Sequence, residues 1–224
     1  MRKGEKRKQE LVGAAMRLFF ERGYENTSVN DILEAVGCSK GSFYHHFESK
    51  MELLEEIARQ RARAGYAAFE EEAPQGDPPA LLDCLLHQAC PFRRGEERFL
   101  SSLVQLMRLR QSAALEQALL EGIDGLFYPA FLSAVAGLDE EGAGPDEARA
   151  FLIWQGFLGG CLLILRQAVA LPLAGRVRSV QLLRALRRQL ESALYLPCGS
   201  LVIMEAEEMA QALENALGGF ASLA

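Results

Sequence analysis

The chain has 224 residues, of which 50% are apolar and 24% are charged, and its net charge is −6. This composition excludes a disordered or collagen-like chain and allows one or two folded domains. Five cysteines are too few for a disulfide scaffold. The first ten residues are charged and no apolar segment follows them, so we expect no secretion signal and a cytoplasmic protein.

The charges are divided unevenly along the sequence. Residues 1–50 hold nine Lys or Arg and seven Asp or Glu, whereas residues 51–224 hold fifteen and twenty-three. The basic residues of the N-terminus are Arg2, Lys3, Lys6, Arg7 and Lys8. A basic front on an acidic body is typical either of a solvated terminus or of a segment that contacts a polyanion.

Apolar residues recur at helical spacing, and strand-like alternation is nearly absent, so the predicted fold class is all-α. Four helices are expected before the break at residues 74–79: one that ends at Gly23, one over 29–36, one over 40–46 and one that begins after Ser49. Beyond the break, helical segments are expected near 80–90, 96–109, 112–136, 146–169, 178–195 and 203–217. The total is about nine to ten helices, with Pro129 expected to kink or split one of them. The longest apolar stretch, 150–165, is shorter than the roughly 20 residues that span a bilayer, and it predicts a buried helix.

Residues 23–50 contain helix signals at short intervals. Ser28 followed by Asp31 is typical of a capping box, although Asp is shorter than the preferred Glu. Gly37 suits a tight turn, and Ser39 suits the cap of the next helix. Two short helices joined by such a turn form a helix-turn-helix.

The third helix carries the chemistry of this motif. Phe43 and Phe47 are spaced to pack inward against Ile32 and Leu33. The residues left to face outward are small, aromatic and rich in hydrogen-bond donors: Lys40, Gly41, Ser42, Tyr44, His45 and His46. Such groups suit phosphate oxygens and base edges in a major groove.

Three blocks of this region resemble the TetR family of bacterial transcriptional regulators. They are Gly-Tyr-x-x-Thr-Ser-Val-x-x-Ile at 23–32, Ala-Val-Gly-Cys-Ser-Lys-Gly-Ser-Phe-Tyr-His-His-Phe at 35–47, and Ser-Lys-x-x-Leu at 49–53. The resemblance covers about residues 8–56. It implies an N-terminal three-helix, helix-turn-helix DNA-binding domain at 1–50, with the connecting helix over 50–73, and an effector-binding and dimerisation domain at 74–224.

The resemblance also implies roles for individual residues. Thr27 and Ser28 would hold phosphate before the second helix, and Lys50 would hold phosphate at the fourth. Tyr44 would contact the DNA backbone or a thymine methyl group, while His45 and His46 would reach a phosphate or a base edge. The N-terminal part of the recognition helix would be formed by Ser39, Lys40, Gly41 and Ser42. Cys38, in the turn, is interpreted as a packing residue rather than a redox switch.

A DNA reader of this size normally acts as a dimer on two half-sites, so we expect a homodimer on a palindromic operator. Two helices are expected to form the interface, and the alternative is that both are internal core. The candidate residues are Gly156, Gly160, Leu183, Leu186, Leu190 and Leu194.

A pocket for a small apolar or aromatic effector is the second expectation for the body. Its candidates lie on the fourth to eighth helices and could instead be packed core: Tyr66, Phe69, His87, Met107, Phe127, Tyr128, Phe131, Trp154, Phe157 and Cys161. Cys84, His87 and Cys90 form a triplet that suits zinc only poorly, because one straight helix spreads the three side chains apart. We expect no metal and no cofactor.

The motifs of common enzymes, such as a glycine-rich phosphate loop or a nucleophile elbow, do not occur. We therefore expect no enzyme and predict a ligand-responsive repressor. The alternatives are an activator of the same fold and a module that binds another protein instead of DNA.

Overall fold

The computed structural model describes residues 3–93, 96–108, 112–138, 145–170 and 172–218. Within these ranges every regular element is a helix, which confirms the predicted all-α class. The ten helices are α1 (Lys3–Arg22), α2 (Val29–Val36), α3 (Lys40–Tyr44), α4 (Lys50–Glu72), α5 (Pro78–Ala89), α6 (Glu97–Arg108), α7 (Ala113–Ala136), α8 (Glu147–Ala170), α9 (Pro172–Ala193) and α10 (Ala206–Gly218).

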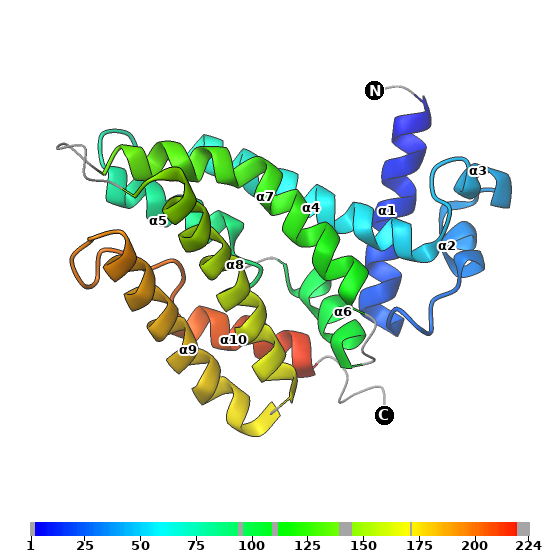
Figure 1. Ribbon diagram of the computed structural model, residues 1–224. Helices are drawn as coiled ribbons and strands as arrows, with labels where there is room; N and C mark the ends of the chain where they lie inside the picture. Colours follow the sequence, from blue (N-terminus) through cyan, green and yellow to red (C-terminus); the bar gives the residue numbers. More distant parts are fainter. Residues whose placement is uncertain (1–2, 94–95, 109–111, 139–144, 171, 219–224) are drawn as a thin grey trace.

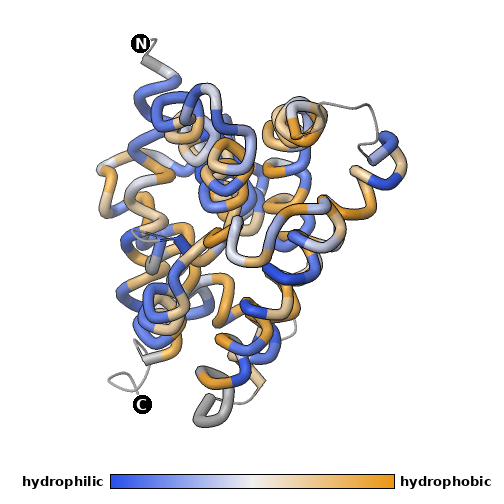
Figure 2. The backbone as a smooth tube through the Cα atoms, turned by 90° about the vertical axis from the view of Figure 1, so that its left-hand side faces the viewer, coloured by the Kyte–Doolittle hydropathy of each residue, from blue (hydrophilic) through white to orange (hydrophobic). Residues whose placement is uncertain are grey.

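The first three helices, which we call the head, lie at one end of the molecule, and the helices α5–α10, which we call the body, form a bundle beside them (Figure 1). The long helix α4 runs between the two and packs on α1 at one side and on α7 and α5 at the other. Hydrophilic and hydrophobic residues alternate along most of the backbone (Figure 2), as helices with one buried face require.

The structure differs from the predicted elements at several points. Helix α3 ends at Tyr44 instead of His46, and the next residues continue as hydrogen-bonded turns, with the N–H of Phe47 donating to the carbonyl of Phe43 at 2.9 Å. Helix α9 begins at Pro172, six residues before the predicted start. Pro129 does not split its segment, because α7 is continuous around it.

Two described helices, α7 and α8, are long and apolar enough to cross a membrane by length and composition alone. The apolar stretch 150–165 lies within α8, whose 24 residues nearly coincide with the predicted helix at 146–169 and include the buried Trp154, Phe157 and Leu165. Both helices carry polar links within the bundle. The indole N–H of Trp154 donates to Asp124 at 2.7 Å, and Arg166 pairs with Glu116 at 2.6 Å.

The aromatic candidates for a pocket pack on one another in two groups. Tyr66, Phe69 and Phe127 form the first, with ring centroids 5.3 to 6.4 Å apart. Trp154 is the centre of the second and has ring partners in Phe131 at 5.2 Å and Phe157 at 5.7 Å. Tyr128 lies at the edge of this second group, 6.3 Å from Trp154. These contacts are those of a packed core, and the pocket remains a prediction.

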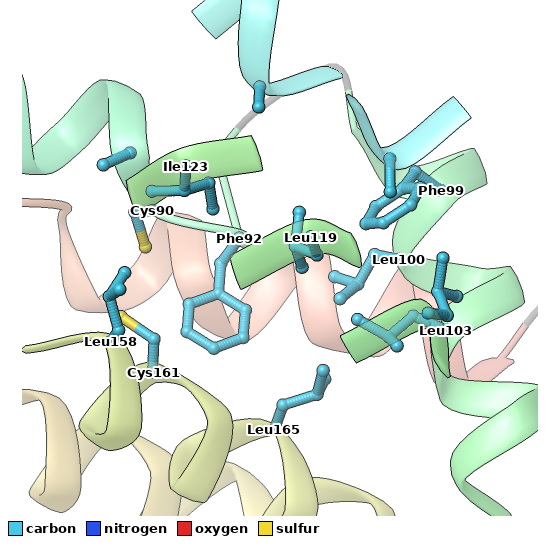
Figure 3. Close-up of a cluster of buried hydrophobic side chains, with 14 of the residues drawn as sticks. Cys90, Phe92, Phe99, Leu100, Leu103, Leu119, Ile123, Leu158, Cys161 and Leu165 are labelled. Carbon is cyan, nitrogen blue, oxygen red and sulfur yellow. The ribbon is translucent and has the colours of Figure 1, made fainter. Parts of the chain in front are cut away.

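Two further pocket candidates have defined partners. His87 Nδ1 lies 2.6 Å from the carbonyl oxygen of Ile203, which ties α5 to the segment before α10. Cys161 is buried and hydrogen-bonded to the thiol of Cys90, and Figure 3 shows both sulfur atoms between α8 and the end of α5. The tenth candidate, Met107, is half-buried against the same core. Since Cys90 faces Cys161 and His87 faces Ile203, the Cys-His-Cys triplet does not converge on one point.

The predicted dimer residues divide between the inside and the outside of the protomer. A Cβ added at Gly160 would lie 2.7 Å from Leu186, so Gly160 packs against α9 of its own chain. The leucine stripe of α9 is at most 6% exposed and also faces the protomer core; its members are Leu183, Leu186, Leu190 and Leu194. These five assignments to a dimer interface are wrong, because an apolar stripe shows that a face is covered but not by which chain. Gly156 lies on the outer face of α8, where an added Cβ would meet nothing within 4 Å.

Candidate nucleic-acid interface

The helix-turn-helix is held by local hydrogen bonds that the sequence predicted. Ser28 caps α2 and accepts from the N–H of Asp31 at 3.1 Å, while the Asp31 carboxylate accepts from the N–H of Ser28 at 2.7 Å. The hydrogen bonds from Ser28 hold the pKa of the Asp31 carboxyl below its ordinary value. Both arms of the capping box therefore form, even though the acid is the shorter one.

The turn between α2 and α3 depends on Gly37. Its φ of 66° is left-handed, and its N–H donates to the carbonyl of Glu34 while that of Cys38 donates to Leu33. This paired arrangement ends α2 at a position that favours glycine. Ser39 then caps α3 by accepting from the N–H of Ser42 at 3.3 Å.

Helix α3 is anchored by its aromatic residues and presents polar ones. Phe43 and Phe47 are 0% and 2% exposed and belong to the same buried cluster as Ile32 and Leu33, which confirms the predicted inward face. Tyr44 on the opposite side is 56% exposed. The other members of the predicted contact face are also exposed or half-buried: Ser28, Ser39, Lys40, Gly41, Ser42, His45 and His46. The chain thus places a row of donors on one surface.

A hollow of about 530 Å³ lies between the start of α1 and α3. Lys6 and Arg7 line it from α1, and Ser42, His45 and His46 line it from the α3 side. Burial, the neighbouring His45 and Lys8 lower the pKa of His46, against an opposing effect of Glu5. The basic start of α1 therefore lies next to α3, where Arg7 pairs with Glu10, which also lines the hollow, and Lys6 is exposed. Arg2 and the side chain of Lys3 lie outside the described part of the chain.

Thr27 does not take the predicted phosphate-binding position. Its side chain is fully buried, and its hydroxyl donates to the carbonyls of Gly23 at 2.8 Å and Leu18 at 3.3 Å. A hydroxyl committed to closing the turn after α1 faces away from solvent. The assignment of this side chain to DNA contact is wrong, because the sequence motif does not distinguish a buried threonine from an exposed one.

Lys50 is also engaged within the protein. Its ammonium donates to the carbonyls of Tyr24 at 2.7 Å and Thr27 at 2.9 Å, and it lies 4.0 Å from the centre of the Tyr24 ring. Burial lowers the pKa of this ammonium from its ordinary value. Lys50 therefore joins the start of α4 to the loop before α2, which places it as a structural residue of the head and not as a free phosphate ligand.

We expect Lys50→Met to destabilise the head, because the carbonyls of Tyr24 and Thr27 lose a charged donor. Hydrogen bonds to charged groups contribute about 1.5–3 kcal/mol, so the free energy of unfolding in urea should fall by about that amount. Lys40→Met is the matched control: Lys40 is exposed, so its loss should weaken DNA binding and leave unfolding unchanged. A Lys50→Met variant as stable as the parent, with a salt dependence of DNA binding lowered by about one unit, would restore the phosphate role.

A link between head and body was missed by sequence reasoning. The side-chain amide oxygen of Gln105, on α6, accepts from the backbone N–H of Tyr24 at 2.6 Å. Gly23 has a φ of 85°, and a Cβ there would collide with the Gln105 amide. Burial, followed by Glu25 and Glu55, raises the pKa of Tyr24 to about 12. No sequence signal connects residues 81 positions apart, so this contact could come only from the fold.

The comparisons with known proteins agree with this geometry. The profile of the bacterial regulatory proteins of the tetR family matches residues 11–57. The transcriptional repressor KstR2 of Rhodococcus jostii is 40% identical over 81 residues, which is 36% of this chain and 40% of that protein. The repressor AcnR of Corynebacterium diphtheriae is 43% identical over 81 residues, or 36% of this chain and 41% of that protein. The chain thus matches about two fifths of the length of these relatives.

A similar fold occurs in the solved structure of GusR from Salmonella enterica, with a TM-score of 0.55 and 24% identity over 87% of this chain and 98% of that one. The helix-turn-helix with its capped, donor-bearing α3 is of the DNA-binding class. Residues 11–57 thus match the tetR family profile, and the all-helical fold is similar to that of GusR.

Proposed function

We propose that this protein is a homodimeric transcriptional repressor that binds a palindromic operator through α3 and is released by a small apolar or aromatic effector. The observation that carries the DNA-binding part is the exposed surface of α3, where Tyr44 is 56% exposed and Ser42 lines a hollow together with the basic start of α1. Two relatives named as repressors support the direction of regulation. A regulator of this kind acts in the cytoplasm and has no catalytic role.

The outer face of α8 supports the dimer. Leu152 is 70% exposed and Leu163 is 47% exposed, and Gly156 and Gly159 lie between them with open space where a Cβ would be. Large apolar side chains around small residues suit close approach of a second helix. A two-fold axis at this face would make the same residues meet in both subunits and would bring two heads to one duplex.

The effector part rests on the aromatic groups around Phe127 and Trp154. They bring a large apolar surface into the body with Asp124 as a nearby polar group. Apolar walls with few polar groups suit an apolar or aromatic molecule. Such a molecule shifts the protein between states only by its difference in affinity for them.

The proposal is tested by selecting random DNA duplexes with the purified protein at about 0.15 M salt, an ionic strength at which non-specific binding is weak. We expect a palindromic sequence with two half-sites about one helical turn apart or a multiple of it. Tyr44→Ala should weaken binding of the selected duplex about 5- to 150-fold, which corresponds to 1–3 kcal/mol, without changing helicity. Selection of a single half-site would contradict the dimer, and no enrichment with a stable, helical protein would favour the protein-binding alternative.

A further inference from the structure

A cleft of about 390 Å³ lies at the junction of head and body and is separate from the aromatic groups described above. Helix α1 lines it with Val12, Gly13 and Met16, and α4 lines it with Ile57 and Arg61. Val12 and Met16 on α1, and Ile57 and Arg61 on α4, are four residues apart, so each pair lies on one face of its helix. Figure 1 shows α1, α4 and α6 meeting in this part of the molecule. The volume lies in the range of small-molecule sites.

The lining of the cleft is mainly apolar but includes a buried charge. Arg61 is 5% exposed and donates to the carbonyl of Cys90 at 2.8 Å, and its guanidinium lies 5.4 Å from the centre of the Phe99 ring. Its Nε lies 3.3 Å from Glu96, yet that N–H has no acceptor in hydrogen-bonding geometry. A buried donor without an acceptor is costly, and an oxygen atom supplied from the cleft would remove that cost.

The charged residues that line the cleft are Arg61 and Glu96. The Glu96 carboxylate is shared between two arginines: it lies 3.3 Å from Arg61 and 2.7 Å from Arg93. Arg93 is not among the lining residues and adds a second guanidinium behind Glu96, so that the three side chains together carry one net positive charge. A ligand carboxylate next to Arg61 would complete the pairing and leave Glu96 to Arg93.

From this arrangement we propose that the cleft between α1, α4 and α6 binds a small amphipathic carboxylate, with the acid group toward Arg61 and the apolar part along Val12, Ile57 and Phe99. At about 30 Å³ for each water-sized group, the cleft holds roughly a dozen non-hydrogen atoms. A medium-chain aliphatic acid matches this size and chemistry. Because one wall belongs to the head and the other to the body, the bound acid bridges the two. The binding itself does not depend on the proposed function.

The test is calorimetric titration of the full-length protein, without DNA, with octanoate, octanol and octylamine as probes. We expect octanoate to bind at least tenfold more tightly than either octanol or octylamine, because only octanoate offers a charged acceptor to the Nε of Arg61. Equal binding of octylamine and octanoate, or no binding of octanoate, would overturn the proposal.

Gly13→Leu locates the binding. Gly13 is exposed on α1 and an added Cβ meets nothing within 4 Å, so the leucine fills the cleft without displacing the core. Gly125→Leu is the matched control, since Gly125 is also exposed and open but lies on α7. We expect octanoate affinity to fall at least tenfold in Gly13→Leu and to stay unchanged in Gly125→Leu. Unchanged binding by Gly13→Leu would place the acid elsewhere and overturn the assignment.

Discussion

Replacing Trp154 with alanine is expected to lower the free energy of unfolding by about 3–5 kcal/mol, the usual cost of truncating a buried aromatic residue. Trp154 is fully buried, has three ring partners and donates to Asp124 at 2.7 Å. The loss is a large part of the ~5–15 kcal/mol that stabilises a typical domain. Trp154 is the one tryptophan of the chain, so the variant has no tryptophan fluorescence. Its unfolding in urea should therefore be followed by circular dichroism.

Trp154→Phe separates the volume of the ring from its hydrogen bond. Phenylalanine keeps most of the contact with Phe131 and Phe157 but leaves Asp124 with Gln155 as its remaining side-chain donor, at 3.2 Å. We expect a smaller loss, of about 1–3 kcal/mol. An alanine variant within about 1 kcal/mol of the parent would show that the aromatic group lines an open cavity and does not form a packed core.

Two glycines of α8 lie one helical turn apart, and replacing each with leucine should change the free energy of unfolding in opposite directions. In Gly160→Leu the new side chain meets Leu186 of α9, and overpacking of this kind costs about 1–3 kcal/mol. In Gly156→Leu the side chain points outward, and the helix gains up to about 1 kcal/mol from the loss of a glycine. Urea unfolding of both variants at the same protein concentration measures this difference.

The dependence of stability on protein concentration distinguishes overpacking inside the protomer from a change at a dimer interface. The loss in Gly160→Leu arises inside the protomer and should be the same at low and high concentration. If the outer face of α8 is the dimer interface, Gly156→Leu should weaken association at least tenfold in sedimentation, and its apparent stability should depend on concentration. Identical sedimentation of Gly156→Leu and the parent would exclude close helix contact at this position.

The head could be predicted closely from the sequence because its determinants are local. Ser28, Gly37 and Ser39 specify caps and a turn within a few residues, and the spacing of Phe43 and Phe47 fixes which side of α3 is buried. The site predictions that were wrong depend on contacts between residues that are distant in the chain. Lys50 has the expected location but donates to carbonyls 23 and 26 residues away, and no motif shows that.

In the body, periodicity identified the helices but not their neighbours. The leucines of α9 form the same stripe in the sequence whether they pack on α8 of their own chain or on another chain. Only the contact between Gly160 and Leu186 shows that they pack within the protomer. Gln105 belongs to no sequence motif, although its side-chain oxygen accepts a hydrogen bond from the backbone N–H of Tyr24. The buried Arg61 is likewise indistinguishable in the sequence from the exposed arginines around it.

The length of α4 sets a mechanical scale for the molecule. Its 23 residues form a rod about 34 Å long, which carries Lys50 and the head at one end and packs on α5 and α7 along the rest. A tilt of about 5° at the body end moves the far end by about 3 Å, close to the ~3.4 Å between successive base pairs. In the proposed dimer both rods tilt, so a tilt of about 5° in each subunit changes the separation of the two heads by up to about 6 Å, or roughly two base-pair steps.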